Sequence, residues 1–300
     1  MAGTVAAVPG FGSNPGALRM LAYAPVGLAP GRPLVAVLHG CRQDAARFAA
    51  DAGWIALAEQ FQFALLLPEQ AYGNNPGRCF NWFNPGDIRR GCGEAMSVRQ
   101  MVRAAIARFG SDRRRVFVAG FSAGGGMAAA LLAAYPAVFA AGAVVAGMPV
   151  GCASTPIGAM LRMRRADLGR SRVALAGDAR TAAGSAPRRA WPRLSIWQGE
   201  RDRVVDPGNA EALAAQWGAL HGHGPAPTAD QAAGGIRRRG WGRPNRAASV
   251  ELWTLGGLGH GYPVDPATPA SGRAGAWVVD AGLSATRLMA AFWGLEPPGR

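Results

Sequence analysis

Short apolar runs alternate with segments of helical spacing along most of this chain, and this alternation constrains the fold more than any other feature of the sequence. The apolar runs predict buried strands at 34–38, 63–67, 116–119, 140–145, 194–197 and 250–255. The segments between and after them predict helices at 47–60, 95–109, 125–134, 208–218 and 281–293. Strands that alternate with helices favour an α/β fold with a mostly parallel central sheet and helices on both of its faces.

The chain is long enough to form such a sheet as one unit. It has 300 residues, of which 49% are hydrophobic and 17% charged, and this excludes a disordered chain or a charged coiled coil. No internal repeat or linker divides it, so we expect a single domain over residues 1–300. Residues 151–190 and 222–246 are irregular and rich in Arg and Gly, and we expect them to be insertions or lids.

The basic charge of the chain raises the question of a polyanionic partner. The chain has 32 basic and 18 acidic residues and a net charge of +14, but it contains no Lys. Its basic clusters are small, at 113–115, 162–165 and 237–239, and no nucleic-acid-binding motif accompanies them. We therefore expect no specific nucleic-acid partner. A basic binding protein on an enzyme-like scaffold is the remote alternative.

Several other classes of protein are excluded by what the sequence lacks. No apolar run reaches about 18 residues, so we expect no membrane-spanning helix. The first twenty residues contain one Arg and no apolar core of about 7–15 residues, so no signal peptide is expected in this sequence. The four cysteines include no CxxC pair, which makes a structural zinc site unexpected.

The strongest local motif is Gly120-Phe-Ser122-Ala-Gly124, which lies between a predicted strand and a predicted helix. A nucleophilic serine projects from such a sharp turn, and the flanking glycines permit the close backbone approach that the turn requires. The amino terminus of the following helix favours negative charge near the serine. The alternative is a glycine-rich turn that binds phosphate or only packs. We interpret Ser122 as the nucleophile.

A serine nucleophile requires a general base and an acid that orients the base. In the order expected for this topology the acid and then the histidine follow the serine, and His260 fits because it lies in a glycine-rich turn after the 250–255 strand. We interpret His39 as support for the loop after its strand. The other two histidines lie in a polar stretch and are expected to be solvated: they are His221 and His223.

The acid is expected in the segment after the 194–197 strand. The candidates there are Glu200, Asp202 and Asp206, and we prefer Asp202 because it lies on a loop at the carboxyl end of a strand. The oxyanion that forms during acyl transfer needs two backbone amides. We expect these from Ala123, directly after the nucleophile, and from Cys41, in the loop after the 34–38 strand. This chemistry requires no metal and no organic cofactor.

Six motifs of the sequence form a recognisable set: His39–Gln43, Gly53–Ala58, Pro68–Gln70, Asn75–Phe83, Gly91–Glu94 and Gly120–Met127. Together they resemble the PHB depolymerase family of esterases, a family with the α/β-hydrolase fold that is close to feruloyl and acetylxylan esterases. The resemblance implies a triad of Ser122, Asp202 and His260. It also implies a serine esterase that acts on poly(3-hydroxyalkanoate) chains or oligomers, with feruloyl or acetyl esters of plant polysaccharides as the alternative, and it implies secretion.

Two further expectations concern the loops of these motifs. The aromatic residues Phe80, Trp82 and Phe83 either line the acyl pocket or pack as core beneath a long loop. Cys41 and Cys79 occur in two motif loops near the expected mouth of the site, which favours a disulfide between them. Pairing with Cys92 or Cys152, or four free thiols, stays open. We expect a monomer or weak oligomer.

Overall fold

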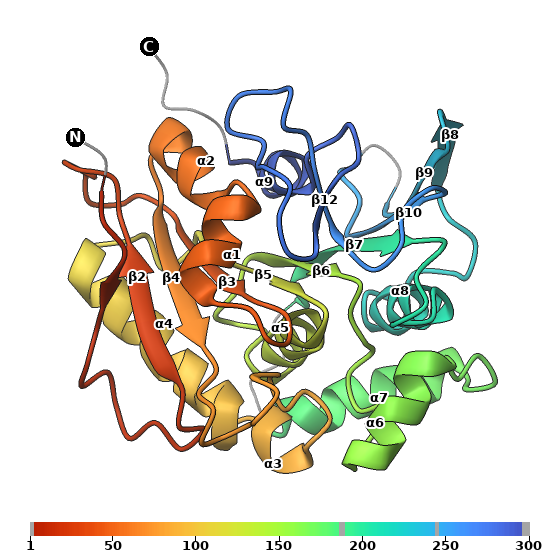
Figure 1. The fold of residues 1–300 in the computed structure, drawn as a ribbon. Helices are drawn as coiled ribbons and strands as arrows, with labels where there is room; N and C mark the ends of the chain where they lie inside the picture. The colour runs from red at the N-terminus through yellow and green to blue at the C-terminus, as the bar shows by residue number, and fades with distance from the viewer. Residues whose placement is uncertain (1–2, 186–189, 244–245, 296–300) are drawn as a thin grey trace.

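The computed structural model describes residues 3–185, 190–243 and 246–295. Its centre is a ten-stranded sheet with the strand order β1-β2-β4-β3-β5-β6-β7-β10-β9-β8 (Figure 1). The strands of this sheet are β1 (Ala6–Ala7), β2 (Arg19–Tyr23), β3 (Leu34–Leu38), β4 (Ala64–Glu69), β5 (Val116–Phe121), β6 (Ala141–Val145), β7 (Arg193–Gly199), β8 (Ala229–Ala233), β9 (Ile236–Trp241) and β10 (Val250–Leu255). A small second sheet pairs β11 (Tyr262–Val264) with β12 (Val278–Asp280).

The central part of the large sheet is parallel. Strands β4, β3, β5, β6, β7 and β10 all run in the same direction. Antiparallel strands extend the sheet at both ends: β2 and β1 beyond β4, and β9 and β8 beyond β10. The predicted α/β fold with a mostly parallel sheet is therefore confirmed.

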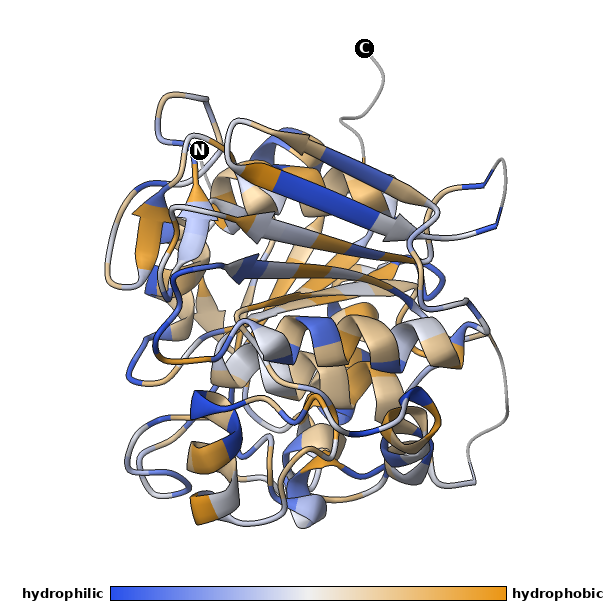
Figure 2. Ribbon diagram, turned by 90° about the vertical axis from the view of Figure 1, so that its right-hand side faces the viewer, coloured by the Kyte–Doolittle hydropathy of each residue, from blue (hydrophilic) through white to orange (hydrophobic). Residues whose placement is uncertain are grey.

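Helices cover both faces of the sheet, as Figure 2 shows from the side. The helices are α1 (Ala45–Asp51), α2 (Trp54–Phe61), α3 (Pro85–Ile88), α4 (Gly93–Phe109), α5 (Ala123–Ala134), α6 (Pro156–Arg164), α7 (Arg172–Ala183), α8 (Gly208–Leu220) and α9 (Ala285–Trp293). One hydrophobic core joins the sheet to α4, α5, α7 and α8. The other joins the opposite face to α1, α2 and α9. The sheet is therefore buried on both sides through most of its width.

Two predicted elements near the amino terminus have different bounds. The helix expected at 47–60 is two helices, α1 and α2, because Gly53 between them has a φ of +85°. A Cβ at Gly53 would lie 2.7 Å from the amide nitrogen of Gly272, so the distant loop packs into this break. Strand β4 continues through Pro68, where the sequence predicted its end. The pairing of β4 with β3 ends at Leu66. Pro68, which has no backbone N–H, therefore costs no hydrogen bond to β3.

Residues 151–190 were expected to be irregular, and they contain helices α6 and α7 instead. Both helices begin at signals present in the sequence. Thr155 accepts a hydrogen bond from the Gly158 amide (3.1 Å), and Ser171 accepts one from the Ala174 amide (3.2 Å). Composition hid these caps, because the segment is rich in Arg and Gly. Residues 186–189 of this segment lie outside the described part of the chain.

Residues 222–246 were also expected to be irregular, but they contain the hairpin β8–β9. Gly234 and Gly235 form its two-residue turn, with φ values of +57° and +78°. The Gly-Gly pair is the signal that predicts such a turn, and strand β8 is exposed along its whole length, so no apolar pattern marks it. Residues 244–245 lie outside the described part of the chain. In the described residues, no helix combines the length and the apolar character needed to cross a membrane.

Candidate active site

Four loops at the carboxyl ends of parallel strands carry the residues predicted to do chemistry. Cys41 follows β3, Ser122 follows β5, Asp202 follows β7 and His260 follows β10. Because these strands are parallel, their carboxyl ends lie at one edge of the sheet. The fold therefore brings together residues that are more than two hundred positions apart.

Ser122 lies in a strained turn between β5 and α5. Its φ of 55° and ψ of −120° are outside the regions that a residue with a side chain ordinarily adopts. The flanking glycines make this turn possible. A Cβ at Gly120 would collide with the Gly124 carbonyl oxygen, and a Cβ at Gly124 would lie 2.5 Å from the Leu38 carbonyl oxygen. The turn points the serine hydroxyl away from the sheet and toward the His260 loop.

Ser122, His260 and Asp202 form a hydrogen-bonded chain. The distance from Ser122 Oγ to His260 Nε2 is 3.1 Å, and the distance from His260 Nδ1 to Asp202 Oδ2 is 2.7 Å. A carboxylate only accepts, so Nδ1 carries the proton and Nε2 is left to accept from the serine hydroxyl. The imidazole is thus in the tautomer that a general base requires.

Asp202 is held as a carboxylate by its surroundings. Burial raises its pKa, but hydrogen bonding and charge attraction to His260, together with backbone donors, outweigh burial and hold the pKa below its ordinary value. The amides of Val204 and Val205 both donate to Oδ1 at 2.8 Å. Gln198 Nε2 donates to Oδ2 at 3.1 Å. These contacts fix the carboxylate toward the imidazole.

The other two acid candidates have different surroundings. Asp206 accepts hydrogen bonds from the amides of Gly208 (2.8 Å) and Ala166 (3.2 Å). It therefore joins the start of α8 to the loop that follows α6. Glu200 is exposed to solvent. Of the three candidates, the structure brings only Asp202 into hydrogen-bond contact with His260.

Two aromatic rings hold the His260 imidazole. The Phe121 ring lies 5.0 Å from it, and the Trp277 ring lies 5.8 Å away with its edge toward the imidazole. Half of the Trp277 surface is exposed, at 51%. The sequence did not single out Trp277, because an isolated aromatic residue in a loop has no periodic signal. Gln43 Nε2 donates to the Ala276 carbonyl (2.9 Å) and ties this loop to the loop after β3.

His39 supports the loop after β3, as its position predicted. Its Nδ1 donates to the Gly40 carbonyl (2.7 Å), and its Nε2 accepts from the Gln70 amide (3.2 Å). Burial lowers the pKa of His39 to about 4, so the ring is neutral near pH 7. The expectation that His221 and His223 are solvated is wrong, because the two rings stack at 5.7 Å and both residues are half-buried.

Cys41 and Ala123 line the same cavity as Ser122. Within the described residues, neither of their backbone amides donates to another group of the chain. Gly40 donates its amide to Gln43 Oε1 (2.7 Å), which fixes the turn that presents Cys41. Cys41 also forms a disulfide with Cys79, the pairing that the motif loops favoured. The other two cysteines of the sequence are free thiols: Cys92 and Cys152.

The cavity beside Ser122 has a volume of about 260 Å³ and a mostly apolar lining. Trp82 and Phe83 line it, but Phe80 does not. The Phe80 side chain is fully buried and packs 5.0 Å from the His39 ring, so the substrate-binding expectation is not retained for it. Further lining residues that the sequence did not reveal are Asn75, Met148, Pro156, Ala159, Met160, Met163 and Val205. Helix α6, whose Thr155-Pro156 start was its sequence signal, supplies four of them.

No group of three or more His, Cys, Asp or Glu residues suited to hold a metal ion occurs in residues 3–185, 190–243 and 246–295. Ser122 is linked by hydrogen bonds to an imidazole and, through it, to a carboxylate. This set of groups is suited to acyl transfer through a serine.

Comparisons with known proteins identify the family of the chain. The family described as "Esterase PHB depolymerase" matches residues 18–241. The chain is 39% identical, over 96% of its length and 69% of the relative, to poly(3-hydroxyalkanoate) depolymerase C of Paucimonas lemoignei. It is 27% identical, over 88% of its length and 74% of the relative, to feruloyl esterase B of Talaromyces stipitatus.

Among solved structures, an acetyl xylan esterase from Aspergillus awamori has the same fold. It aligns with a TM-score of 0.83 at 24% identity and covers 98% of this chain and 100% of that chain. The enzyme class and the family expected from the sequence motifs are both confirmed. The chain is an ester hydrolase and belongs to the PHB depolymerase family of esterases.

Proposed function

We propose that this chain hydrolyses carboxylic esters through a catalytic triad of Ser122, His260 and Asp202 and a covalent acyl-enzyme. The observation that carries the proposal is the continuous hydrogen-bonded chain from the Ser122 hydroxyl to the Asp202 carboxylate. The strained turn at Ser122 supports it, because strain of this kind persists where a side chain must be presented to a substrate.

The reaction proceeds in two halves. His260 Nε2 takes the proton of Ser122 as Oγ attacks the acyl carbon, and the imidazolium then protonates the departing alcohol. Water enters, His260 takes one of its protons as the water oxygen attacks the acyl carbon, and the bond from Ser122 Oγ to that carbon then breaks. The imidazolium returns the proton to Ser122 Oγ, and the acid leaves. Asp202 keeps its charge throughout, because its pKa is below the ordinary range, and it stabilises the imidazolium.

The amides of Cys41 and Ala123 stabilise the oxyanion. The negative charge that develops on the acyl oxygen needs two donors that are already oriented. Cys41 and Ala123 line the cavity, and their amides have no other acceptor in the described chain. The disulfide to Cys79 and the Gly40–Gln43 hydrogen bond support the position of Cys41. The hole is therefore formed before substrate arrives.

We propose poly(3-hydroxyalkanoate) chains or oligomers as the substrate. The relative with 39% identity carries that substrate in its name, and the cavity beside Ser122 has an apolar lining that suits a short aliphatic acyl group. Helix α6, which lines this cavity, also exposes apolar side chains beside it: Ile157, Met160 and Leu161 are 73%, 61% and 64% exposed. We propose a single catalytic domain in which α6 and α7 cover the acyl side of the site.

A feruloyl ester is the second candidate. Trp82 and Phe83 line the cavity with their rings edge to face, 5.7 Å apart, and such rings also suit an aromatic acyl group. A basic binding protein is a weaker candidate, because the arginines of the 237–239 cluster do not form a free basic stripe. Each has a carboxylate partner, respectively Asp230, Glu251 and Glu211.

Labelling with a fluorophosphonate followed by peptide mapping tests the reaction class. We expect modification at Ser122, and we expect Ser122→Ala to lose roughly four to six orders of magnitude in kcat on a short p-nitrophenyl ester while the fold is kept. An undiminished rate in that variant would refute the triad. Release of 3-hydroxybutyrate from its oligomers, compared with release of ferulate from methyl ferulate, then separates the two substrate candidates.

A further inference from the structure

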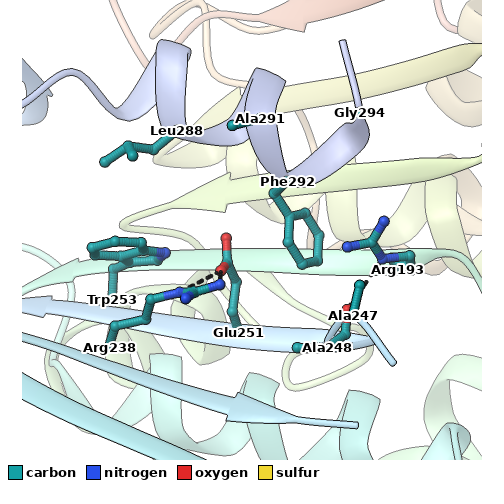
Figure 3. A pocket seen from close by; sticks show the side chains of 10 residues that line it. All are labelled: Arg193, Arg238, Ala247, Ala248, Glu251, Trp253, Leu288, Ala291, Phe292 and Gly294. Carbon is teal, nitrogen blue, oxygen red and sulfur yellow. Dashed lines mark hydrogen bonds and ion pairs between the residues drawn. The ribbon is translucent and has the colours of Figure 1, made fainter. Parts of the chain in front are cut away.

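A second cavity, of about 550 Å³, lies at the amino-terminal ends of β7 and β10, beside α9 (Figure 3). It is at the opposite end of these strands from Asp202 and His260, and on the opposite face of the sheet from the acyl cavity. Its volume is within the ordinary range of small-molecule sites. The proposed hydrolysis makes no use of it.

The charged groups of this cavity leave one positive charge in excess. Arg193 and Arg238 line it together with Glu251. Arg238 pairs with Glu251, whose Oε2 accepts from Nε at 2.9 Å and from Nη2 at 2.8 Å. Glu251 is almost fully buried, and its second oxygen accepts from Ser195 Oγ at 2.7 Å. Glu251 therefore neutralises Arg238 and is itself fully engaged, so the guanidinium of Arg193 is the uncompensated charge.

Two sets of donors in the cavity are unused. Arg193 donates Nε to the Ala248 carbonyl at 3.1 Å, but its two terminal nitrogens have no acceptor in the described part of the chain. Trp253 Nε1 is buried and has no hydrogen-bond partner among the described residues. A buried donor without an acceptor is unfavourable, so an acceptor from outside the chain would be favoured here.

The remaining lining is apolar. The Arg193 guanidinium lies over the Phe292 ring, 4.1 Å from its centre, and Leu288 is next to Phe292 on the same helix. In Figure 3 the Phe292 ring extends from α9 into the space between Arg193 and Trp253. Trp253 in turn stacks on Trp197, 4.7 Å away and nearly parallel, which fixes its indole.

We propose that this cavity binds an organic monocarboxylate that has an apolar body and a second oxygen acceptor, such as a hydroxy acid or a hydroxycinnamic acid. The carboxylate accepts from the terminal nitrogens of Arg193, since a planar guanidinium suits a carboxylate. The apolar body packs on Phe292 and Leu288. The second oxygen accepts from Trp253 Nε1. One uncompensated charge favours a monoanion over a phosphate dianion. The site needs no catalytic activity of Ser122.

The indole N–H of Trp253 provides a direct measurement. In the ¹H–¹⁵N spectrum of the full chain, Trp253→Phe identifies its indole signal by the loss of one peak. The Ser122→Ala protein is titrated with ferulate and with 3-hydroxyoctanoate, and the neutral amides of the two acids serve as controls. We expect the Trp253 signal to shift with the acids, and we expect at least about tenfold weaker binding of the amides.

Two variants test the charge. Arg193→Gln should weaken binding of the acids about tenfold or more, whereas Arg113→Gln, which removes an exposed charge elsewhere, should leave it unchanged. If Arg193→Gln does not fold, the comparison of each acid with its amide carries the test alone. A Trp253 signal that neither acid shifts, or equal affinity for acid and amide, would overturn the proposal. Loss of esterase activity in Ser122→Ala has no bearing on this result, so the two proposals fail separately.

Discussion

The two cavities at opposite ends of β7 and β10 are built on different principles. At the carboxyl ends, the side chains of the triad are already paired: Asp202 accepts from His260, Gln198 and two backbone amides. The backbone there is also strained at Ser122 and at Trp277, which have positive φ values of 55° and 62°. At the amino ends, the lining residues of β7 and β10 belong to regular strands, and donors are left without acceptors.

This difference separates a site built for chemistry from a site suited to binding. Acyl transfer needs side chains that are oriented before substrate arrives, so the chain itself supplies the hydrogen-bond partners of Asp202 and His260 and leaves only the Cys41 and Ala123 amides for the substrate oxygen. A binding cavity gains affinity when the ligand supplies the missing partner, so unpaired donors there are an advantage. Substitutions that act on one end and leave the other unchanged test whether this separation is real.

The largest effect is expected from Asp202→Asn. The asparagine fits the same space but no longer orients the imidazole or stabilises its cation, so kcat should fall by roughly three to four orders of magnitude. The matched control is Asp206→Asn, four residues away, which removes a carboxylate charge but keeps an acceptor for the Gly208 amide and does not touch His260. We expect its kcat to change less than about threefold. Steady-state kinetics on a p-nitrophenyl ester measures both.

The Asp202→Asn variant also tests the separation of the two cavities. The indole signal of Trp253 should keep its position, because the amino-end cavity shares no lining residue with the triad. A displaced Trp253 signal would show that the two ends are coupled through β7 and β10. Equal kinetics of the two aspartate variants would instead remove Asp202 from the triad.

Gly124→Ala is expected to have the next largest effect, and it acts on stability. The new Cβ would lie 2.5 Å from the Leu38 carbonyl oxygen, and a backbone atom cannot move away cheaply, so we expect a loss of about 2–3 kcal/mol. Gly177→Ala in α7 is the control. No atom lies within 4 Å of its Cβ position, so it should stabilise the chain by about 0.5–1 kcal/mol. Chemical denaturation of both variants gives the two signs.

The serine turn could be predicted from the sequence because its requirements are local. Gly120 and Gly124 mark a turn that rejects side chains, and the order of Asp202 and His260 follows from the order of the strands. The positions of the six parallel strands were predicted for the same reason, since continuous apolar runs such as 34–38 are typical of strands buried on both faces. The antiparallel strands that extend the sheet, β1, β2, β8 and β9, were not predicted.

The apolar cavity wall could not be predicted, because it depends on distant contacts. Helix α6 buries little of its own surface, so its sequence has no strong apolar pattern. Met160 and Met163 can be recognised as cavity residues only in the folded chain, where they line the same cavity as Trp82. Trp277 touches His260 through a loop whose position depends on a hydrogen bond from Gln43. Neither contact leaves a pattern in the sequence.

Acid should destabilise the carboxyl-end loops through His39. Its pKa is lowered to about 4 mainly by burial, with Arg78 nearby, while Glu69 and Asp44 oppose the shift. The unfolded chain, with a histidine pKa near 6.5, takes up a proton that the folded chain refuses between about pH 6.5 and 4. His39 therefore makes its full contribution to the free energy of unfolding above pH 6.5. This contribution falls as the pH drops and levels off below pH 4, and the total loss is up to about 3 kcal/mol.

His39→Gln provides the comparison for this pH effect. The glutamine does not titrate, so the free energy of unfolding of the variant should fall less steeply between pH 6.5 and 4 than that of the natural chain. Urea denaturation at several pH values measures the two slopes. Identical slopes would mean that the His39 ring is charged in the folded chain, contrary to its burial.

The smallest effect is expected at the exposed face of α6, beside the acyl cavity. Ile157→Ser combined with Leu161→Ser removes apolar surface that a polyester chain would cover, so hydrolysis of suspended polymer should slow by about threefold to tenfold. The rate on a soluble p-nitrophenyl ester should stay the same, because neither side chain lines the cavity.

Val26→Ser is the matched control for α6, because Val26 is also strongly exposed, at 64%. Val26 follows β2, and the end of β2 at Tyr23 pairs near the amino end of β4, away from the carboxyl-end site. The Val26→Ser variant should change neither rate. An equal loss on polymer and soluble ester in the α6 variant would mean that α6 shapes the catalytic cavity and does not contact the polymer. Loss on polymer alone would extend the carboxyl-end site from a pocket for one acyl group to a surface that holds a chain. The cavity among Arg193, Phe292 and Trp253, which is proposed to bind one small acid, does not need such a surface.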